Sequence, residues 1–286
     1  MDQIVCEAPA KINLTLDILR RRPDGYHDLC MVMQSISLCD RLTVKLAPGG
    51  GIHIHMPGSE LSEGPDNLVW KAAQVFFRAA DMTGGGAEIT VVKQIPAQAG
   101  MAGGSTDAAA ALRALNELCG NVFSSDALEK LGQQIGSDVP FCVRGGAALA
   151  EGRGERLTTL PGLPPCGIVV CKPDFGLPTP ELFRRVRVDA LRRRPDTEAM
   201  LRALERGSLS EAAEQLANVF EEVLTEQESR EISGIEDSMR RQGAMNAAMT
   251  GSGPTVFGLF ENQKAAARCA EELKNRWTQV FLAEPR

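Results

Sequence analysis

Apolar and polar residues alternate along the segment Ile12–Ile18, which is the pattern of a half-buried strand. Its odd-numbered side chains, Lys11, Asn13, Thr15 and Asp17, are therefore predicted to share one polar face. Shorter apolar runs bounded by glycine, proline or charged residues predict further strands. These runs lie at 42–46, 52–56, 88–92, 167–171 and 255–260.

Helical spacing of apolar residues begins after the first strands. The segment 66–80 repeats apolar residues every four positions, and Asp66 is the predicted cap. A second helix follows the glycine-rich segment near 100, and a third begins near Asp126, with Glu129 three residues on as a predicted capping-box partner. Additional helices are predicted at 197–207, 209–224 and 264–277.

Strands and helices are mixed in both halves of the chain without a regular β-α-β alternation. This arrangement predicts an α+β fold. Glycine and proline become frequent between 152 and 166, where helix signals are few. We therefore predict two domains, 1–155 and 156–286.

Composition and charge narrow the possible functions. The 286 residues carry 31 basic and 37 acidic side chains, and a net charge of -6 argues against a large nucleic-acid interface. No stretch approaches the ~20 apolar residues of a membrane span, and the N-terminus lacks the pattern of a secretory signal. The eight cysteines are scattered without zinc-site spacing, which favours reduced thiols and a cytoplasmic location.

Two histidines, His53 and His55, alternate on one face of a predicted strand. Two histidines without a third ligand nearby are weak evidence for a metal site. We interpret them as surface residues of the strand.

A glycine-rich loop precedes the second predicted helix. Gly100, Gly103 and Gly104 are followed directly by Ser105 and Thr106. A helix N-terminus with unpaired amides attracts phosphate, and glycines let the anion approach the backbone closely. No Gly-Lys-Ser/Thr follows, so the loop is not a Walker A motif. The spacing alone fits equally well a structural helix capped by Ser105 or Asp107.

Two further motifs accompany this loop, Ala8–Leu14 (APAKINL) and Met249–Thr255 (MTGSGPT). The three motifs in this order resemble the galactokinase, homoserine kinase and mevalonate kinase (GHMP kinase) superfamily over nearly the whole chain. The resemblance implies a two-domain GHMP kinase fold, with an N-terminal domain like domain 2 of ribosomal protein S5 that binds ATP and substrate. It also implies a ferredoxin-like C-terminal domain.

The segments Arg22–His27 (RPDGYH) and Gly136–Phe141 (GSDVPF) resemble one branch of this superfamily. Its members transfer a phosphoryl group from ATP to the 2-hydroxyl of a cytidine diphosphate-linked methylerythritol, in non-mevalonate isoprenoid biosynthesis. The resemblance implies this small-molecule substrate, ATP as co-substrate, Mg²⁺, and neither nucleic acid nor membrane as partner. The chain is expected to be a monomer or a homodimer.

Phosphoryl transfer requires a positioned hydroxyl, a proton acceptor and stabilisation of the developing charge. Asp138 lies between a predicted helix end and an apolar segment, where a loop can direct a carboxylate into a cleft. Lys11, on the polar face of its strand, is the candidate cation, and the resemblance assigns catalysis to the same two positions. The residues alone leave open that Asp138 is a turn residue bonded to its own backbone and that Lys11 is a solvated lysine.

The resemblance also implies the binding residues. Tyr26 and His27 would hold the cytosine, Phe183 would close its other face, and Asn13 and Thr179 would contact the substrate. Ser105 would be a ligand of the metal. The expected nucleotide-binding residues are Pro96, Ala97, Gln98, Ala99, Gly100, Met101, Ala102, Gly103, Gly104, Ser105 and Thr106, with Asn67 and Lys93 nearer the adenine.

Two other readings remain open. A non-catalytic nucleotide or metabolite sensor could use the same fold, although it would not need both Lys11 and Asp138. Another kinase of the superfamily, or a decarboxylase that acts on a diphosphate, would share the glycine-rich loop. The segment with Tyr26 and His27 counts against the decarboxylase.

Overall fold

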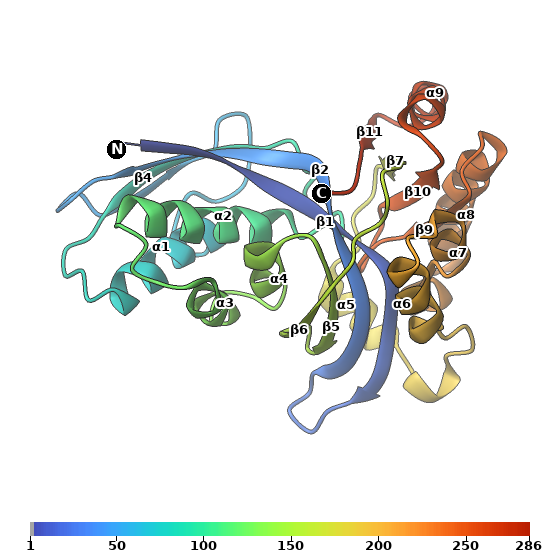
Figure 1. The fold of residues 1–286 in the computed structure, drawn as a ribbon, viewed down its shortest axis with the longest axis horizontal. Coiled ribbons are helices and arrows are strands. Elements are labelled where there is room, and N and C mark those ends of the chain that lie inside the picture. Colours follow the sequence, from blue (N-terminus) through green and yellow to red (C-terminus); the bar gives the residue numbers. More distant parts are fainter. Residues whose placement is uncertain (1–2) are drawn as a thin grey trace. The chain divides into compact units, whose positions relative to one another are not determined.

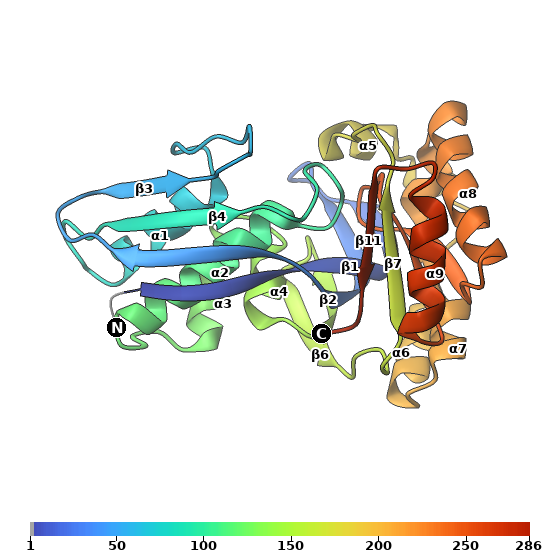
Figure 2. The ribbon, with the colours of Figure 1, turned by 90° about the horizontal axis from the view of Figure 1, so that it is seen from above.

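The computed structural model describes residues 3–286 and divides them into two compact units (Figures 1 and 2). The first unit comprises the chain up to Ala10 together with Cys39–Ile95 and Ala102–Gly145. The second unit comprises Lys11–Leu38, Pro96–Met101 and Gly146–Arg286. The long strands β1 (Gln3–Arg21) and β2 (His27–Leu46) contribute residues to both units. The predicted boundary at 155/156 stays a prediction.

The first unit is a sheet covered by helices. The end of β2 pairs antiparallel with β4 (Ala87–Val92), and β4 pairs parallel with β3 (Ile52–His55). The helices of this unit lie together beside the sheet (Figure 1), and α1 packs on α2. They are α1 (Leu68–Ala79), α2 (Gly103–Leu118), α3 (Ser125–Gln133) and α4 (Val139–Arg144). Fully buried Phe76 and Leu112, from the facing helices α1 and α2, belong to its core.

The second unit contains two groups of strands. In the first group the order is β8-β1-β2-β5-β6, with β5 (Ala147–Gly152), β6 (Arg156–Leu160) and β8 (Ala217–Asn218). The second group is an antiparallel sheet in the order β11-β7-β10-β9. Its strands are β7 (Gly167–Lys172), β9 (Asn246–Met249), β10 (Val256–Phe260) and β11 (Gln279–Ala283).

Helices complete the second unit and fix its fold type. When these four strands are numbered by their order along the chain, their order across the sheet is 4-1-3-2, which is the ferredoxin-like order. The longer helices α8 (Glu226–Arg241) and α9 (Gln263–Leu273) contact this sheet. Shorter segments are α5 (Thr179–Arg185), η1 (Val188–Ala190), α6 (Thr197–Glu205), α7 (Leu209–Glu214) and η2 (Val219–Val223). The predicted α+β class is confirmed, and no helix within residues 3–286 is both long and apolar enough to span a membrane.

The burial of β1 differs from its sequence pattern. Lys11, Asn13, Thr15 and Asp17 are buried like the apolar residues between them, so the prediction of a half-buried strand is wrong. Each of these polar side chains has a polar partner, such as the Arg194 guanidinium 2.6 Å from the Asp17 carboxylate. A buried polar face is tolerated because its groups are hydrogen-bonded.

Three local predictions are also corrected. Asn67, not Asp66, caps α1, because its side chain accepts the amide of Val69 at 2.8 Å. Ser124 caps α3, and Glu129 forms an ion pair with Arg144 at 2.7 Å in place of a capping box.

The helix predicted over 209–224 ends early. Helix α7 stops at Glu214, and the chain then pairs with β1 through β8 and continues as η2. Asn218 explains the break, since its amide donates to the carbonyl oxygens of Met249 and Gly251 and its side-chain oxygen accepts the amide of Phe220. Tertiary hydrogen bonds therefore override the helical pattern.

Candidate active site

The first unit presents an open helix end where phosphate binding was predicted. Helix α2 begins after Ala102, which adopts a left-handed conformation with φ 59°, and no side chain caps it. Within residues 3–286, the backbone N–H groups of Gly103, Gly104 and Ser105 donate no hydrogen bond. Three free amides and the positive end of a 16-residue helix are features that attract an anion. The alternative that Ser105 or Asp107 caps the helix is wrong.

Two glycines of the loop have different structural roles. Gly100 has φ +70°, and a Cβ there would collide with the carbonyl oxygen of Thr250. Gly103 lies in the helix, where a Cβ would meet Ile95 at 3.2 Å and the Lys93 Nζ at 3.4 Å. Gly100 is therefore required by the backbone conformation, whereas a side chain at Gly103 would be tightly packed against Ile95 and Lys93.

Lys93 anchors a buried charge cluster beside this helix end. Its ammonium forms ion pairs with Asp40 and, at 2.6 Å, with Asp107 of α2. Burial alone would lower the pKa of Lys93, but the two carboxylates raise it above its usual value. Burial raises the pKa of Asp107 to about 7, against the opposing effect of Lys93. The ammonium thus stays charged between two buried carboxyl groups, one of which, Asp107, is partly protonated at pH 7.

The remaining predicted nucleotide residues of this unit differ in availability. The Thr106 hydroxyl is buried and donates to the Pro9 carbonyl oxygen at 2.7 Å, which ties α2 to β1. The Asn67 side chain caps α1 and donates to the Ser62 carbonyl oxygen at 2.5 Å. The Ser105 hydroxyl lies 3.9 Å from the position of a Cβ on Gly136 and makes no hydrogen bond within residues 3–286. Among these three side chains, Ser105 is the one left to bind a phosphate oxygen or a metal ion.

Asp138 stands at the start of α4 in the same unit. Its side chain makes no capping bond, and among the described residues no ion pair or hydrogen bond engages its carboxylate. The side chain is half-buried, while Val139, Pro140 and Phe141 that follow are buried and hold the turn in place. The alternative that Asp138 caps its own helix is therefore wrong, and its carboxylate is available as a proton acceptor.

In the second unit the three motifs converge on Lys11. Its ammonium donates to the Asn13 Oδ1 at 2.6 Å and to the Gly100 carbonyl oxygen at 3.0 Å. The Asn13 backbone amide donates to the Thr250 hydroxyl at 2.9 Å. Lys11 is only 4% exposed, so the alternative of a solvated strand lysine is wrong. Lys11 and Asp138 belong to different units, so their catalytic pairing stays a prediction.

The hydrogen bonds of the Lys11 ammonium go to uncharged oxygens. No ion pair of Lys11 is found within residues 3–286, although burial of an unpaired charge is costly. Two uncharged oxygens satisfy part of its donor capacity, which leaves the charge available to an anion. The site therefore favours a phosphate or a developing alkoxide near Lys11.

Aromatic side chains predicted to hold a base lie together in the second unit. The His27 ring stacks on Phe183 with centroids 5.1 Å apart and an interplanar angle of 20°. Phe183 is supported edge-on by Phe220 at 4.9 Å. Burial, with the positive charge of Arg21, lowers the pKa of His27, so its ring is neutral at pH 7. A neutral ring both donates and accepts hydrogen bonds.

Tyr26 and Thr179 complete the predicted substrate residues. Tyr26 is 55% exposed, and the Arg153 guanidinium lies over its ring at 4.5 Å from the centroid. The Thr179 hydroxyl is 2.7 Å from the Ser252 hydroxyl of the third motif. The structure thus groups Lys11, Asn13 and Thr179 around the motifs, and His27 with Phe183.

His53 and His55 are exposed on β3, as predicted. His53 bonds the Gly50 carbonyl oxygen at 2.6 Å, and His55 lies 3.3 Å from Glu63. No group of three potential metal ligands is found in the described part of the chain.

Family models match the chain in two stretches. The model described as GHMP kinases N terminal domain matches residues 67–146, and the one described as GHMP kinases C terminal matches residues 200–279. The chain belongs to the GHMP kinase family. The first match in this GHMP kinase contains α2 with its open end and Asp138, and the second contains β9, β10, α8 and α9 of the ferredoxin-like part.

Two curated relatives of this GHMP kinase carry the same name. The 4-diphosphocytidyl-2-C-methyl-D-erythritol kinase of Pelotomaculum thermopropionicum is 46% identical, over 98% of this chain and 96% of the relative. That of Geobacillus kaustophilus is 44% identical, over 96% and 94%. A crystal structure of 4-(cytidine 5'-diphospho)-2C-methyl-D-erythritol kinase aligns with a TM-score of 0.83 and 36% identity, over 99% of both chains.

A more distant structure supports the fold alone. Homoserine kinase from Cytophaga hutchinsonii aligns with a TM-score of 0.77 at 16% identity, over 99% of this chain and 95% of that one. The predicted fold and family are therefore confirmed.

Several residues of this GHMP kinase site were not found from the sequence. Asp40 is separated from Lys93 by 53 residues, and Ser252 from Thr179 by 73, so no local pattern marks either pair. Asp107 was considered only as a helix cap. Asn218 lies within a helical pattern that hides its role in holding the third motif.

Proposed function

We propose that the protein is an ATP-dependent kinase that phosphorylates the 2-hydroxyl of 4-diphosphocytidyl-2-C-methyl-D-erythritol. The observation that carries the proposal is that hydrogen bonds of Lys11 and Asn13 join the three sequence motifs, while the buried Lys11 ammonium has no carboxylate partner among the described residues. The full-length similarity to kinases named for this substrate supports the choice of substrate.

The triphosphate of ATP would bind at the open end of α2. The free amides of Gly103, Gly104 and Ser105 and the helix dipole match its negative charge. The Lys93 ammonium lies beside Gly103, but its charge is balanced by Asp40 and Asp107, so the amides and the helix dipole supply the attraction. Ser105 would bind Mg²⁺, which would neutralise phosphate charge when present.

Transfer requires removal of the substrate's hydroxyl proton. Asp138 would accept this proton while the hydroxyl oxygen bonds to the γ-phosphorus and the bond from that phosphorus to the β–γ bridging oxygen breaks. Lys11 would stabilise the negative charge that develops on the attacking oxygen. The products are ADP and a phosphate monoester.

The cytidine part of the substrate would bind in the second unit. Neutral His27 would hydrogen-bond the base edge, and the Tyr26 ring, 55% exposed, offers a stacking surface. Asn13 and Thr179 would contact the rest of the substrate. We expect the enzyme to act in the cytoplasm as a monomer or a homodimer.

An ADP-release assay with purified protein tests the proposal. ATP and Mg²⁺ are combined in turn with the cytidine substrate, homoserine, mevalonate and mevalonate diphosphate, and ADP and carbon dioxide are measured. We expect ADP with the cytidine substrate only, and no carbon dioxide. ADP release with another substrate only would indicate a different kinase of the family, and carbon dioxide would indicate a decarboxylase. Binding of ATP and the cytidine substrate without turnover would indicate a sensor.

A further inference from the structure

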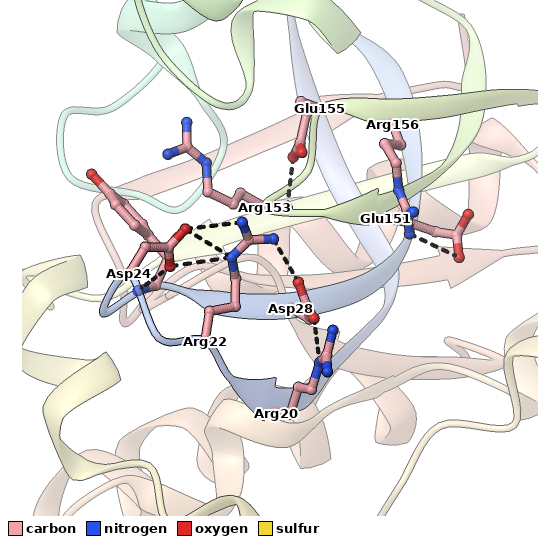
Figure 3. A network of polar contacts seen from close by, with 9 residues as sticks. Arg20, Arg22, Asp24, Asp28, Glu151, Arg153, Glu155 and Arg156 are labelled. Atoms are coloured by element: carbon pink, nitrogen blue, oxygen red, sulfur yellow. Dashed lines mark hydrogen bonds and ion pairs between the residues drawn. The ribbon is translucent and has the colours of Figure 1, made fainter.

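Arg153 differs from the other arginines in the polar network of Figure 3. There, Arg20 and Arg22 are ion-paired with Asp28, and Arg156 with Glu151. Arg22 also holds the Asp24 carboxylate at 2.9 Å. Within residues 3–286 no acidic side chain or carbonyl oxygen is bonded to the guanidinium of Arg153, although carboxylates surround it in the sequence.

The nearby carboxylates are already engaged. Asp24 accepts three hydrogen bonds from the Arg22 guanidinium and one from the Tyr26 amide. Glu155 accepts the backbone amide of Arg153 at 2.6 Å. Figure 3 shows the Arg153 side chain extending away from Glu151 and Glu155. Its five N–H donors are therefore directed elsewhere.

The turn between β5 and β6 fixes the position of Arg153. Gly152 and Gly154 have φ +71° and +111°, and a Cβ on Gly152 would lie 2.8 Å from the Glu155 carboxylate. Strand β5 pairs with β2, with Leu29 opposite Gly152, so this turn lies next to the segment that carries Tyr26 and His27. The hairpin thus presents Arg153 at the predicted cytidine site by backbone constraint.

The guanidinium lies over the Tyr26 ring at 4.5 Å from the centroid. Stacking on an aromatic face orients a guanidinium and leaves its N–H groups free in the plane. Tyr26 remains 55% exposed, so ring surface is left for a base. A cytidine diphosphate places its diphosphate one ribose away from its base.

We propose that Arg153 binds the diphosphate of the substrate and thereby determines the preference for a nucleoside diphosphate over a nucleoside. The proposal rests on the function proposed above. A guanidinium can bind two phosphate oxygens in a bidentate pair. Within the described residues, Arg153 has no ion pair with a carboxylate that would have to break first. Arg153 is thus a specificity-determining residue that acts by direct contact with the substrate.

Calorimetry on the full chain with CDP and with cytidine tests this role. Cytidine has the base and ribose but no phosphate, so the ratio of the two dissociation constants isolates the diphosphate. We expect wild type to bind CDP at least tenfold more tightly than cytidine, and Arg153→Gln to reduce that preference to less than threefold. Cytidine affinity should change less than twofold.

Arg156→Gln is the matched control, because this arginine lies on the same hairpin but is paired with Glu151. It should leave the preference for CDP unchanged. If Arg153→Gln weakens the binding of CDP and of cytidine equally, Arg153 only supports the Tyr26 ring. If the preference for CDP is unchanged, Arg153 does not contact the diphosphate. Either result overturns the proposal. If wild type releases ADP from the cytidine substrate but shows no preference for CDP, this inference fails and the proposed function stands.

Discussion

The Lys11 ammonium donates to the backbone carbonyl oxygen of Gly100 at 3.0 Å, although the two residues are 89 positions apart. This bond joins the first motif to the glycine-rich loop within one unit. The backbone amide of Lys11 also donates to the Met101 carbonyl oxygen at 3.2 Å. The lysine is therefore held by the loop that leads into α2, and its charge remains free for an anion.

Asp138→Asn removes the proposed base while keeping the side-chain shape. We expect kcat to fall by roughly 10²–10⁴-fold, with little change in substrate affinity, because the amide cannot accept the hydroxyl proton. Steady-state ADP release and calorimetry measure the two quantities. Asp126→Asn, in the first turn of α3, is a control that should retain kcat. Near-normal turnover in Asp138→Asn would place the base elsewhere or show that transfer needs none.

Gly103→Val should weaken ATP binding by at least tenfold. Its Cβ would lie 3.2 Å from Ile95 and 3.4 Å from the Lys93 Nζ, so a valine must displace the helix end or the lysine. Gly234→Val, in α8, is the control, because a Cβ there would meet no atom within 4 Å. We expect this variant to keep the ATP affinity of wild type. Equal ATP affinities in Gly103→Val and wild type would show that this helix end does not bind the triphosphate.

His27→Ala should weaken binding of the cytidine substrate and leave ATP binding unchanged. A base edge left without its partner costs about 1–3 kcal/mol, or roughly 5- to 150-fold in affinity. Dissociation constants for both ligands provide the test. Tyr26→Ala should act in the same direction, although its ring also contacts Arg153. Loss of ATP affinity with intact substrate affinity would rule out a cytidine site at Tyr26 and His27.

Glu221 predicts a pH dependence of stability in the second unit. Burial and the neighbouring charge of Glu236 raise the pKa of Glu221 from 4.5 to about 7. The folded state then binds more protons than the unfolded state between these values, so the free energy of unfolding falls as pH rises through this window. The Glu221→Gln side chain can still accept the Met249 amide through its Oε1 but carries no charge.

The free energy of unfolding of Glu221→Gln should therefore rise relative to that of wild type between pH 5 and pH 8, by on the order of 3 kcal/mol. Urea denaturation at several pH values measures it. Glu205→Gln, at the exposed end of α6, should show no such trend. Parallel curves for Glu221→Gln and wild type would mean that Glu221 is ionised throughout.

The sequence predicts those parts of the fold that depend on local pattern. Alternation gave the strand around Ile12–Ile18, and helical spacing gave α1 and α2. Burial of the polar face of β1 could not be predicted, because Arg194, which bonds the Asp17 carboxylate, is 177 residues away in the chain. Long-range partners leave no periodic signal.

The candidate site was predictable to a similar extent. The glycine-rich loop and Asp138 stand out by composition and position, and resemblance adds Lys11 and His27. The cluster of Lys93 with Asp40 and Asp107 and the position of the Arg153 guanidinium over Tyr26 depend on tertiary contacts. Such contacts decide which side chains are engaged and which remain available, so they could be identified only in the structure.

The proton-coupled ³¹P NMR spectrum of the reaction product tests the central claim most directly. The 2-carbon of a 2-C-methylerythritol carries a methyl group and no hydrogen, so a phosphate on its hydroxyl has no three-bond coupling to a proton. After incubation of the protein with ATP, Mg²⁺ and 4-diphosphocytidyl-2-C-methyl-D-erythritol, we predict a new monoester resonance that is a singlet, together with ADP. A doublet would place the phosphate on the secondary 3-hydroxyl and a triplet on the primary 1-hydroxyl. Either of these, or the absence of a new resonance, would contradict the proposed function.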